Sequence, residues 1–307
     1  MALSQFLNTF AGNPLDRAGD RREDTAWLAE QLERPDGSCL AIWEGGVLVE
    51  DGPDGVRAAW LRPDMARDAA GDDWVFLGLW KDAPVFAVRF PGEADPTAGP
   101  LEGLGRFLDM RSAAGALPGV EAAMAGAAKS LFDWHGRSGF CAVCGQKSAP
   151  DCGGWKRRCP ACSTDHFPRL DPVVIMLAVY QGGDEPVCLL GRQAAWPAKR
   201  MSALAGFMEP GESIEEACAR EVQEEAGLTV TSVAYHSSQP WPFPHQLMIG
   251  LICEVDTRDA RPNQTELEAV AWLTKAEARA VLEGAHPDIH APPPFAIAHS
   301  LIRAWAG

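Results

Sequence analysis

One short acidic stretch of the sequence, residues 206–228, has residue types and spacing that could hold a divalent cation. Its distinctive residues are, in chain order, Gly206, Glu212, Arg220, Glu221, Glu224, Glu225 and Gly227. Carboxylate oxygens are the ligands that hard cations such as Mg²⁺ prefer. A cation held by several glutamates can neutralise phosphate oxygens and activate water. The stretch therefore indicates metal-dependent phosphate chemistry.

The same stretch predicts the helix that positions these glutamates. Ser213 followed by Glu216 is a capping box, and Gly227 is typical of the position just after a helix end. On a helical wheel, Glu221 and Glu225 fall on the apolar side, one turn apart. Two like charges at this spacing repel, and moving them toward the interior requires that they be paired or neutralised. A solvated acidic helix, the alternative, would carry them on the opposite face.

A second group of chemically distinctive residues is formed by two Cys-x-x-Cys pairs. The pairs are Cys141 with Cys144, and Cys159 with Cys162. Four thiolates complete a tetrahedral Zn²⁺ shell and leave no open position for a substrate. We therefore predict a structural zinc ribbon, and we expect Cys152, between the pairs, to be a spare thiol.

Length and charge bound the class of protein. With 307 residues, 47% of them hydrophobic, the chain can form two or three domains with real cores. The net charge of −15 argues against a broad nucleic-acid surface, although it permits one nucleotide in a local pocket. The sequence has no apolar run long enough for a transmembrane helix and no secretory leader pattern. We expect a cytoplasmic protein.

The order of apolar segments predicts three domains and their secondary structure. The expected domains are a β-rich N-terminal domain over 1–130, the zinc ribbon over 131–168 and a catalytic domain over 169–307. Expected strands are 41–44, 47–49, 75–80, 85–88, 173–180, 187–190, 247–252 and 270–273, and expected helices are 120–131, 275–282 and 295–305. The alternation in the last domain predicts an α/β (α+β) fold, an α/β/α sandwich with a mixed sheet.

Several motifs together resemble one known family. The acidic stretch resembles the Nudix hydrolase box, with every fixed position at its spacing. The surrounding sequence resembles the NADH pyrophosphatase branch of that superfamily. The cysteine pairs precede the box domain directly, Phe167–Pro172 joins them, and Ser238–Pro244 is similar to the specificity array of the branch. The array departs from the usual form at its end, where Gln246 stands in place of Ser.

The resemblance implies a set of site residues. Glu221, Glu224 and Glu225 would be catalytic and would bind Mg²⁺ or Mn²⁺, together with Glu266 and the carbonyl of Ala205. Phe167 and Phe207 would enclose the aromatic end of the substrate, Arg111 would contact phosphate, and Ala298 would line the same pocket. The array itself would bind substrate through Gln239, Pro240, Trp241, Pro242, Phe243, Pro244, His245 and Gln246.

The resemblance also implies an activity. The expected reaction is hydrolysis of the diphosphate of NADH or NAD to nicotinamide mononucleotide and AMP, by a homodimer with one structural Zn²⁺ per chain. The same chemistry would remove an NAD cap from the 5′ end of RNA. Two alternatives stay open: a Nudix hydrolase of another nucleoside diphosphate derivative such as ADP-ribose, and a non-enzymatic nucleotide sensor. The intact glutamates of the box argue against the sensor.

Overall fold

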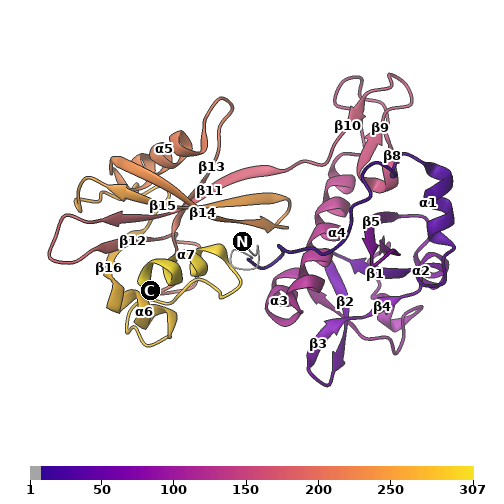
Figure 1. The fold of residues 1–307 in the computed structure, drawn as a ribbon, viewed down its shortest axis with the longest axis horizontal. Coiled ribbons are helices and arrows are strands. Elements are labelled where there is room, and N and C mark those ends of the chain that lie inside the picture. Colours follow the sequence, from indigo (N-terminus) through magenta and orange to yellow (C-terminus); the bar gives the residue numbers. More distant parts are fainter. Residues whose placement is uncertain (1–7) are drawn as a thin grey trace. The chain divides into compact units, whose positions relative to one another are not determined.

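The computed structural model describes residues 8–307, so residues 1–7, where the expected N-terminal domain begins, lie outside the described part (Figure 1). The chain forms two compact units. One contains Phe10–Leu170 and Trp241–His245, and the other contains residues 8–9, Asp171–Pro240 and Gln246–Gly307. The expected zinc ribbon and N-terminal domain thus cluster in one unit, together with part of the specificity array. The three-domain division stays a prediction.

The C-terminal unit is built on a six-stranded mixed sheet. Its elements are β11 (Asp171–Tyr180), β12 (Val187–Arg192), β13 (Leu204–Phe207), α5 (Ile214–Ala226), β14 (Val230–Trp241), β15 (Gln246–Val255), β16 (Ala269–Thr274), α6 (Lys275–Leu282) and α7 (Ile297–Ala306). The strand order is β14-β15-β11-β12-β16, with β13 paired to β11. Strands β11 and β15 are parallel, whereas β12 and β13 run antiparallel to β11.

The central strand β11 supplies side chains to both faces of this sheet. Val174 and Met176 pack in the core that contains the apolar side of α5, and the alternate residues Leu177 and Val179 pack in the core that contains α6 and α7. Successive strand residues point to opposite faces, so one uninterrupted apolar run can serve two layers. Figure 1 shows α5 on one side of the sheet and α6 and α7 on the other. The predicted α/β/α sandwich with a mixed sheet is confirmed.

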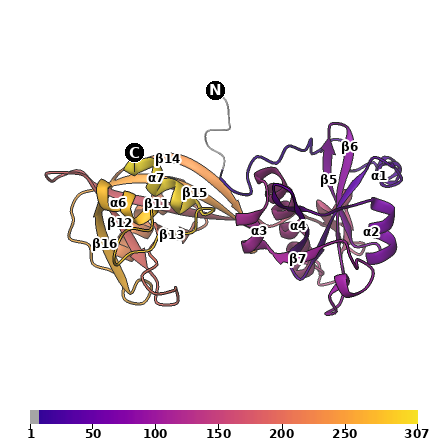
Figure 2. The same ribbon diagram turned by 90° about the horizontal axis from the view of Figure 1, so that it is seen from below.

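The N-terminal unit contains a seven-stranded sheet with helices packed around it (Figure 2). Its elements are α1 (Thr25–Leu32), β1 (Ser38–Trp43), β2 (Gly46–Gly52), β3 (Gly55–Ala58), β4 (Trp60–Leu61), α2 (Pro63–Ala70), β5 (Trp74–Trp80), β6 (Ala83–Arg89), a 3-10 turn η2 (Pro96–Ala98), β7 (Arg106–Asp109), α3 (Met110–Ala116) and α4 (Gly119–Arg137). The strand order is β3-β2-β1-β6-β5, and β4 and β7 pair with β1 and β2. The four strands and the helix expected here are present. Strands β3, β4 and β7 were not predicted.

The ribbon is a three-stranded sheet that is fastened to the core of the same unit. It comprises β8 (Ala149–Asp151), η3 (Cys152–Gly154), β9 (Lys156–Arg158) and β10 (Asp165–His166). The indole Nε1 of Trp155 donates to the carbonyl of Phe76 at 2.6 Å. Gly154 has a φ of +89°, and a Cβ there would lie 2.5 Å from Cγ1 of Val75, so only glycine fits this approach. None of the helices found over residues 8–307 is long and apolar enough to cross a membrane.

Candidate functional site

Helix α5 begins and ends where its capping residues predict. The Ser213 hydroxyl accepts from the Glu216 N–H at 3.2 Å, and the Glu216 carboxylate accepts from the Ser213 N–H at 2.8 Å. Gly227 closes the helix in the left-handed conformation, with φ of 67°. The capping box and the glycine terminus are therefore confirmed, and they fix where the helix that carries the glutamates begins and ends.

Two of the predicted catalytic glutamates are buried on the apolar side of α5. Glu221 is 8% exposed and Glu225 is 4% exposed. Burial, followed by the charge of Glu221, raises the pKa of Glu225 to about 8. Burial also raises the pKa of Glu221. The Oε2 atom of Glu225 is buried and has no hydrogen-bond partner among the described residues. A buried carboxylate oxygen without a partner, beside a second carboxylate, is the donor set that a hard divalent cation fits.

Arg220 holds the remaining carboxylates in place. Its Nε and Nη2 atoms contact the two oxygens of Glu212 at 2.6 and 3.0 Å. Its Nη1 donates to Glu221 at 2.8 Å and to Glu224 at 2.9 Å, and Nη2 also donates to the carbonyl of Phe207 at 2.9 Å. The hydrogen bond from Arg220 lowers the pKa of Glu212 to about 2. The guanidinium thus keeps Glu212 ionised and orients Glu221, while Glu224 stays half-exposed.

A cleft of about 650 Å³ opens over the buried glutamates. Glu221, Glu225, Glu266 and Ala205 all line it, so four of the five predicted ligands of the catalytic metal meet there. Glu224 is not among the lining residues. The cleft is also lined by Gly206 and by six residues that were not predicted, namely Gln193, Ala194, Ala195, Gln264, Thr265 and Glu268. Gly206 is part of the box, but the others lie in polar loops without a motif, so no sequence signal marks them.

Gly206 in β13 is required by the space that Glu221 occupies. A Cβ at this position would lie 1.8 Å from Cδ of Glu221. The glycine therefore lets the carboxylate lie directly against the strand. Gly211, by contrast, has open space around it and a φ of +101°, so it serves the turn before α5.

The other predicted contacts within the C-terminal unit differ in exposure. Phe207, at the end of β13, is 54% exposed and free to contact a ligand. Gln239 is fully buried and Ala298 is 2% exposed within the core under α7. Gln246 is half-buried at the start of β15. Among these four residues, Phe207 has the most accessible side chain.

The array residues Trp241–His245 belong to the N-terminal unit, with Arg111 beside them, whereas Pro240 is an exposed residue of the C-terminal unit. The Arg111 guanidinium carbon lies 4.2 Å from the ring centre of Phe243 and 5.9 Å from that of Trp241. The two rings meet edge to face, with centres 5.0 Å apart, and Phe10 contacts Phe243 from another side. Pro242 and His245 are buried, whereas Phe167 is 69% exposed. Arg111 therefore has Phe243 as an aromatic partner, a contact that the sequence did not predict because 132 positions separate the two residues in the chain.

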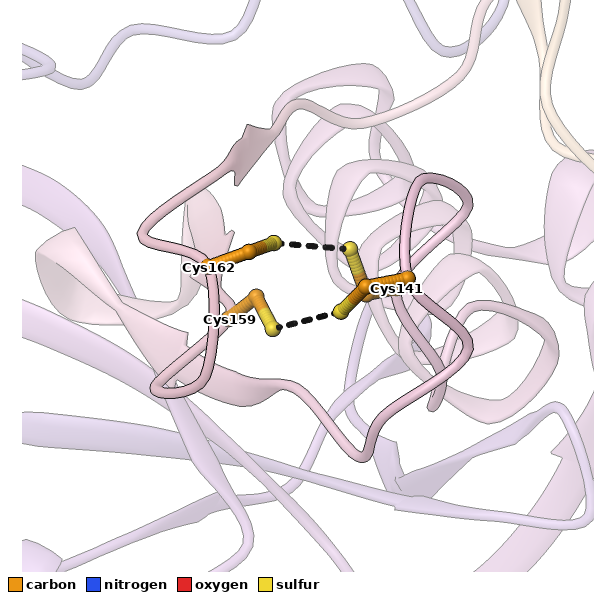
Figure 3. A group of neighbouring side chains, drawn as sticks. Cys141, Cys159 and Cys162 are labelled. Atoms are coloured by element: carbon orange, nitrogen blue, oxygen red, sulfur yellow. Dashed lines mark hydrogen bonds between the residues drawn. The ribbon is translucent and has the colours of Figure 1, made fainter.

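The four predicted zinc ligands come together in the ribbon. Their sulfur atoms all lie within 4.8 Å of one another, and no other such group of three or more candidate ligands occurs over the described chain. The sulfur atoms of Cys141 and Cys162 are 3.6 Å apart (Figure 3). Those of Cys144 and Cys159 are 3.5 Å apart. Zn–S bonds of about 2.3 Å in a tetrahedron place sulfur atoms roughly 3.8 Å apart. The cluster therefore fits a structural Zn²⁺, and Cys152 lies outside it.

Each cysteine pair is held by the same backbone turn. The N–H of Gly145 donates to the carbonyl of Cys141, and that of Ser163 to the carbonyl of Cys159, both at 2.9 Å. Backbone N–H groups at Cys144 and Val143 lower the pKa of Cys141 to about 6. His166 Nε2 lies 3.3 Å from the same sulfur, a neighbour that the cysteine spacing did not predict. These donors favour the thiolate form that zinc binds.

Comparison with family models places three segments of the chain. Residues 169–293 match the NUDIX domain, residues 36–134 match the NADH pyrophosphatase-like rudimentary NUDIX domain, and residues 137–167 match the NADH pyrophosphatase zinc ribbon domain. The rudimentary domain was not predicted, because the N-terminal region carries no acidic box.

Relatives match the chain over different extents. The NAD-capped RNA hydrolase NudC of Mycobacterium bovis is 39% identical over 312 residues, covering 95% of this chain and 94% of the relative. An NAD-capped RNA hydrolase of Homo sapiens is 41% identical over 194 residues, so the matched part spans only 42% of that longer protein. A NUDIX hydrolase structure from Nitrosomonas europaea has 24% identity and a TM-score of 0.42, covering 54% of this chain and 89% of that one.

The raised pKa of Glu225 predicts how stability depends on pH before Mg²⁺ or Mn²⁺ is added. Because its pKa of about 8 in the folded chain exceeds the ordinary 4.5, the contribution of Glu225 to stability is greatest below pH 4.5 and is lost as pH rises toward 8. Each pKa unit corresponds to about 1.4 kcal/mol. Glu225→Gln should remove this loss, giving a higher Tm than wild type at pH 8.5 and a smaller difference at pH 5. The exposed Glu215→Gln is the matched control, and parallel pH profiles in all three proteins would contradict the assignment.

The cysteine cluster predicts a stability effect at the other centre. Cys159→Ser removes one of four thiolates, so we expect loss of zinc in elemental analysis and a lower Tm, since a structural Zn²⁺ contributes on the order of 10 kcal/mol to small zinc domains. Cys152→Ser, outside the cluster, should keep the metal. Stoichiometric zinc in the Cys159 variant, or its absence from wild type, would refute the ribbon assignment.

Proposed function

The chain belongs to the NADH pyrophosphatase branch of the Nudix hydrolase family, and on that premise we propose that it hydrolyses the diphosphate of NADH or NAD. The products would be nicotinamide mononucleotide and AMP. The observation that carries the proposal is the pair of buried carboxylates, Glu221 and Glu225, one turn apart over a cleft that Glu266 and Ala205 also line. Burying two carboxylates costs free energy when no cation neutralises them, whereas a bound divalent cation would use them as ligands.

The glutamates of the cleft would hold Mg²⁺ or Mn²⁺. We assign Glu221, Glu225 and Glu266 as side-chain ligands, with the Ala205 carbonyl beside them, and Glu224 as a further ligand from the exposed end. When bound, the cation supplies Lewis-acid polarisation of the diphosphate. Arg220 contributes by orienting the carboxylates, and its donors to Glu212, Glu221, Glu224 and Phe207 leave it no role in binding substrate.

Glu225 is the preferred base for the attacking water. Its Oε2 atom has no partner among residues 8–307 and its side chain lines the cleft, whereas Glu224 is bonded to Arg220 and lies outside the lining. In the proposed step, the water oxygen forms a bond to one phosphorus and its proton passes to Glu225. The bond from that phosphorus to the bridging oxygen breaks, and the leaving phosphate keeps the electron pair.

Substrate contacts are proposed for both units. In the C-terminal unit, the exposed ring of Phe207 would stack on an aromatic end of the dinucleotide, beside Gln246 and Ala298. In the N-terminal unit, Phe167, Arg111 and the array residues Trp241–His245 would contribute, with Arg111 reaching phosphate from its place against Phe243. Aromatic rings give large contact area at low entropic cost.

Removal of NAD caps from RNA is the second candidate function. It uses the same bond cleavage, and the relatives named NAD-capped RNA hydrolases favour it. A net charge of −15 leaves little general attraction for an RNA chain, so recognition would centre on the cap. The intact acidic box argues against a non-enzymatic sensor, and the array against a hydrolase of ADP-ribose.

Assembly and location complete the proposal. We infer a homodimer from the family resemblance. We infer a cytoplasmic location because all nine cysteines are free and the zinc cluster needs reduced thiolates, which a reducing compartment maintains.

Turnover tests the proposed base. Glu225→Gln keeps the shape of the side chain but removes its charge, so kcat with NADH should fall at least about 100-fold, the scale of losing one electrostatic stabiliser. Products are identified by chromatography with NADH, NAD, ADP-ribose and an NAD-capped RNA, each under Mg²⁺ and Mn²⁺. Glu215→Gln, on the exposed face of the same helix, should stay within about twofold of wild type. Turnover of the Glu225 variant close to wild type, or no cleavage of any substrate by wild type, would sink the proposal.

The ring of Phe207 tests substrate recognition. If it stacks on a base or on nicotinamide, Phe207→Ala should lower kcat/KM for NADH by roughly 5- to 150-fold, equivalent to about 1–3 kcal/mol. Cleavage of a small diphosphate without an aromatic ring should fall much less, and Tm should hold because the side chain is exposed. Tyr235→Ala, another exposed aromatic of this unit, is the control. Equal losses on both substrates would show that Phe207 does not recognise the ring.

A further inference from the structure

Gln239, at the start of the specificity array, has its hydrogen-bonding groups occupied by the protein itself. Its side chain is fully buried. Nε2 donates to the carbonyl of Thr9 at 3.0 Å and to that of Phe295 at 2.7 Å, and Oε1 accepts from the N–H of Ile297 at 2.8 Å. Both amide hydrogens are therefore used.

The partners also determine which way the amide points. Two carbonyl oxygens require donors and one N–H requires an acceptor, so the opposite orientation would place oxygen against oxygen and nitrogen against nitrogen. Glutamine is thus the side chain of its length that matches this set of partners. Glutamate would lack the donors, and methionine would leave all three backbone groups unpaired in the interior.

Gln239 caps helix α7 from a distant strand. Ala296, the residue before the helix, provides no side-chain cap, and the N–H of Ile297 is one of the first-turn donors that no helical carbonyl can satisfy. The amide oxygen of Gln239 accepts from it. The helix start is also close-packed on β15, since a Cβ on Gly250 would lie 2.8 Å from Cδ1 of Ile297 and 3.0 Å from the carbonyl of Ser237.

A neighbouring contact fastens the same part of β14. The Asn8 amide Nδ2 lies 3.0 Å from both the hydroxyl of Ser237 and the carbonyl of Ser238. Residues 8–9, the end of β14 and the start of α7 are therefore bound together by side-chain amides. Pro240 and Trp241 follow directly after this junction, and Ala298 follows Ile297 in α7.

We propose that Gln239 is a positioning residue of the specificity array: its amide binds the start of the array to the first turn of α7 and to Thr9, and it does not contact substrate. The inference rests on the proposed hydrolysis of NADH and changes the role of one array residue within it. Gln239 sets where the chain enters Pro240 and where α7 presents Ala298. Substrate binding depends on both positions.

Steady-state kinetics with two substrates tests this role. Gln239→Met and Gln239→Glu keep the length of the side chain but lose the pattern of donors and acceptor. Because displacement of a site by about 1 Å can cost on the order of 100-fold, we expect kcat/KM for NADH to fall roughly 10- to 100-fold. Most of this loss should lie in KM, since the carboxylates of α5 are untouched. Cleavage of a small diphosphate without an aromatic ring should stay within about threefold of wild type.

Controls separate positioning from general destabilisation. Gln181→Met, at the exposed position just after β11, should match wild type in all measurements. Assays are run well below the lowest Tm of the variants. If Gln239→Met does not fold, Gln239→Glu is used for the kinetic comparison. An unchanged KM for NADH, with or without a lower Tm, overturns the inference, as do equal losses on both substrates. Failure of wild type to cut NADH is seen before any variant is measured, and it overturns the proposed function as well.

Discussion

The arrangement of this site depends on how one arginine compensates several carboxylates. Arg220 contacts three glutamates and the carbonyl of Phe207. Because Arg220 also donates to Glu221, the Glu221 carboxylate lines the cleft without leaving its charge unpaired. Glu225 has no such partner, and its pKa rises to about 8 because of burial and the nearby Glu221. Glu221 is therefore paired with Arg220, whereas Glu225 has an oxygen that is available to a cation or a proton.

Strand β11 brings the glutamates of α5 and the residues of β13 to one place, because it contacts both elements. Strand β11 pairs with β13, which carries Ala205, Gly206 and Phe207, while its residues Val174 and Met176 pack in the core that contains α5. Gly206 is the point of closest approach, because any side chain there would occupy the space of the Glu221 carboxylate. Helix α5 and strand β13 thus fit together at a single residue, and the proposed metal ligands stand on elements that a packed core holds rigid.

Local sequence rules predicted the parts that depend on near neighbours. The capping box, the glycine end of α5 and the two Cys-x-x-Cys pairs each involve residues within a few positions of one another, so spacing alone indicates them. The alternation of strand and helix predicted the sandwich, because an apolar run of eight residues in β11 can only be a buried strand or helix. Short edge elements such as β4 and β7 lack that periodicity, and β13 is too short to show it.

The sequence by itself determined which chemistry the chain carries: a carboxylate helix for a hard cation, four thiolates for zinc, and the family to which both belong. Only the tertiary structure decided which residues the array residues contact. Gln239 meets Thr9 and Phe295 across more than 200 and more than 50 residues, and Phe243 meets Arg111 across more than 100. Such long-range contacts give no local sequence pattern, so the sequence alone does not distinguish a residue that contacts the protein from one that contacts a ligand. Burial then makes each unpaired amide costly, and that cost assigns Gln239 to the protein rather than to a ligand.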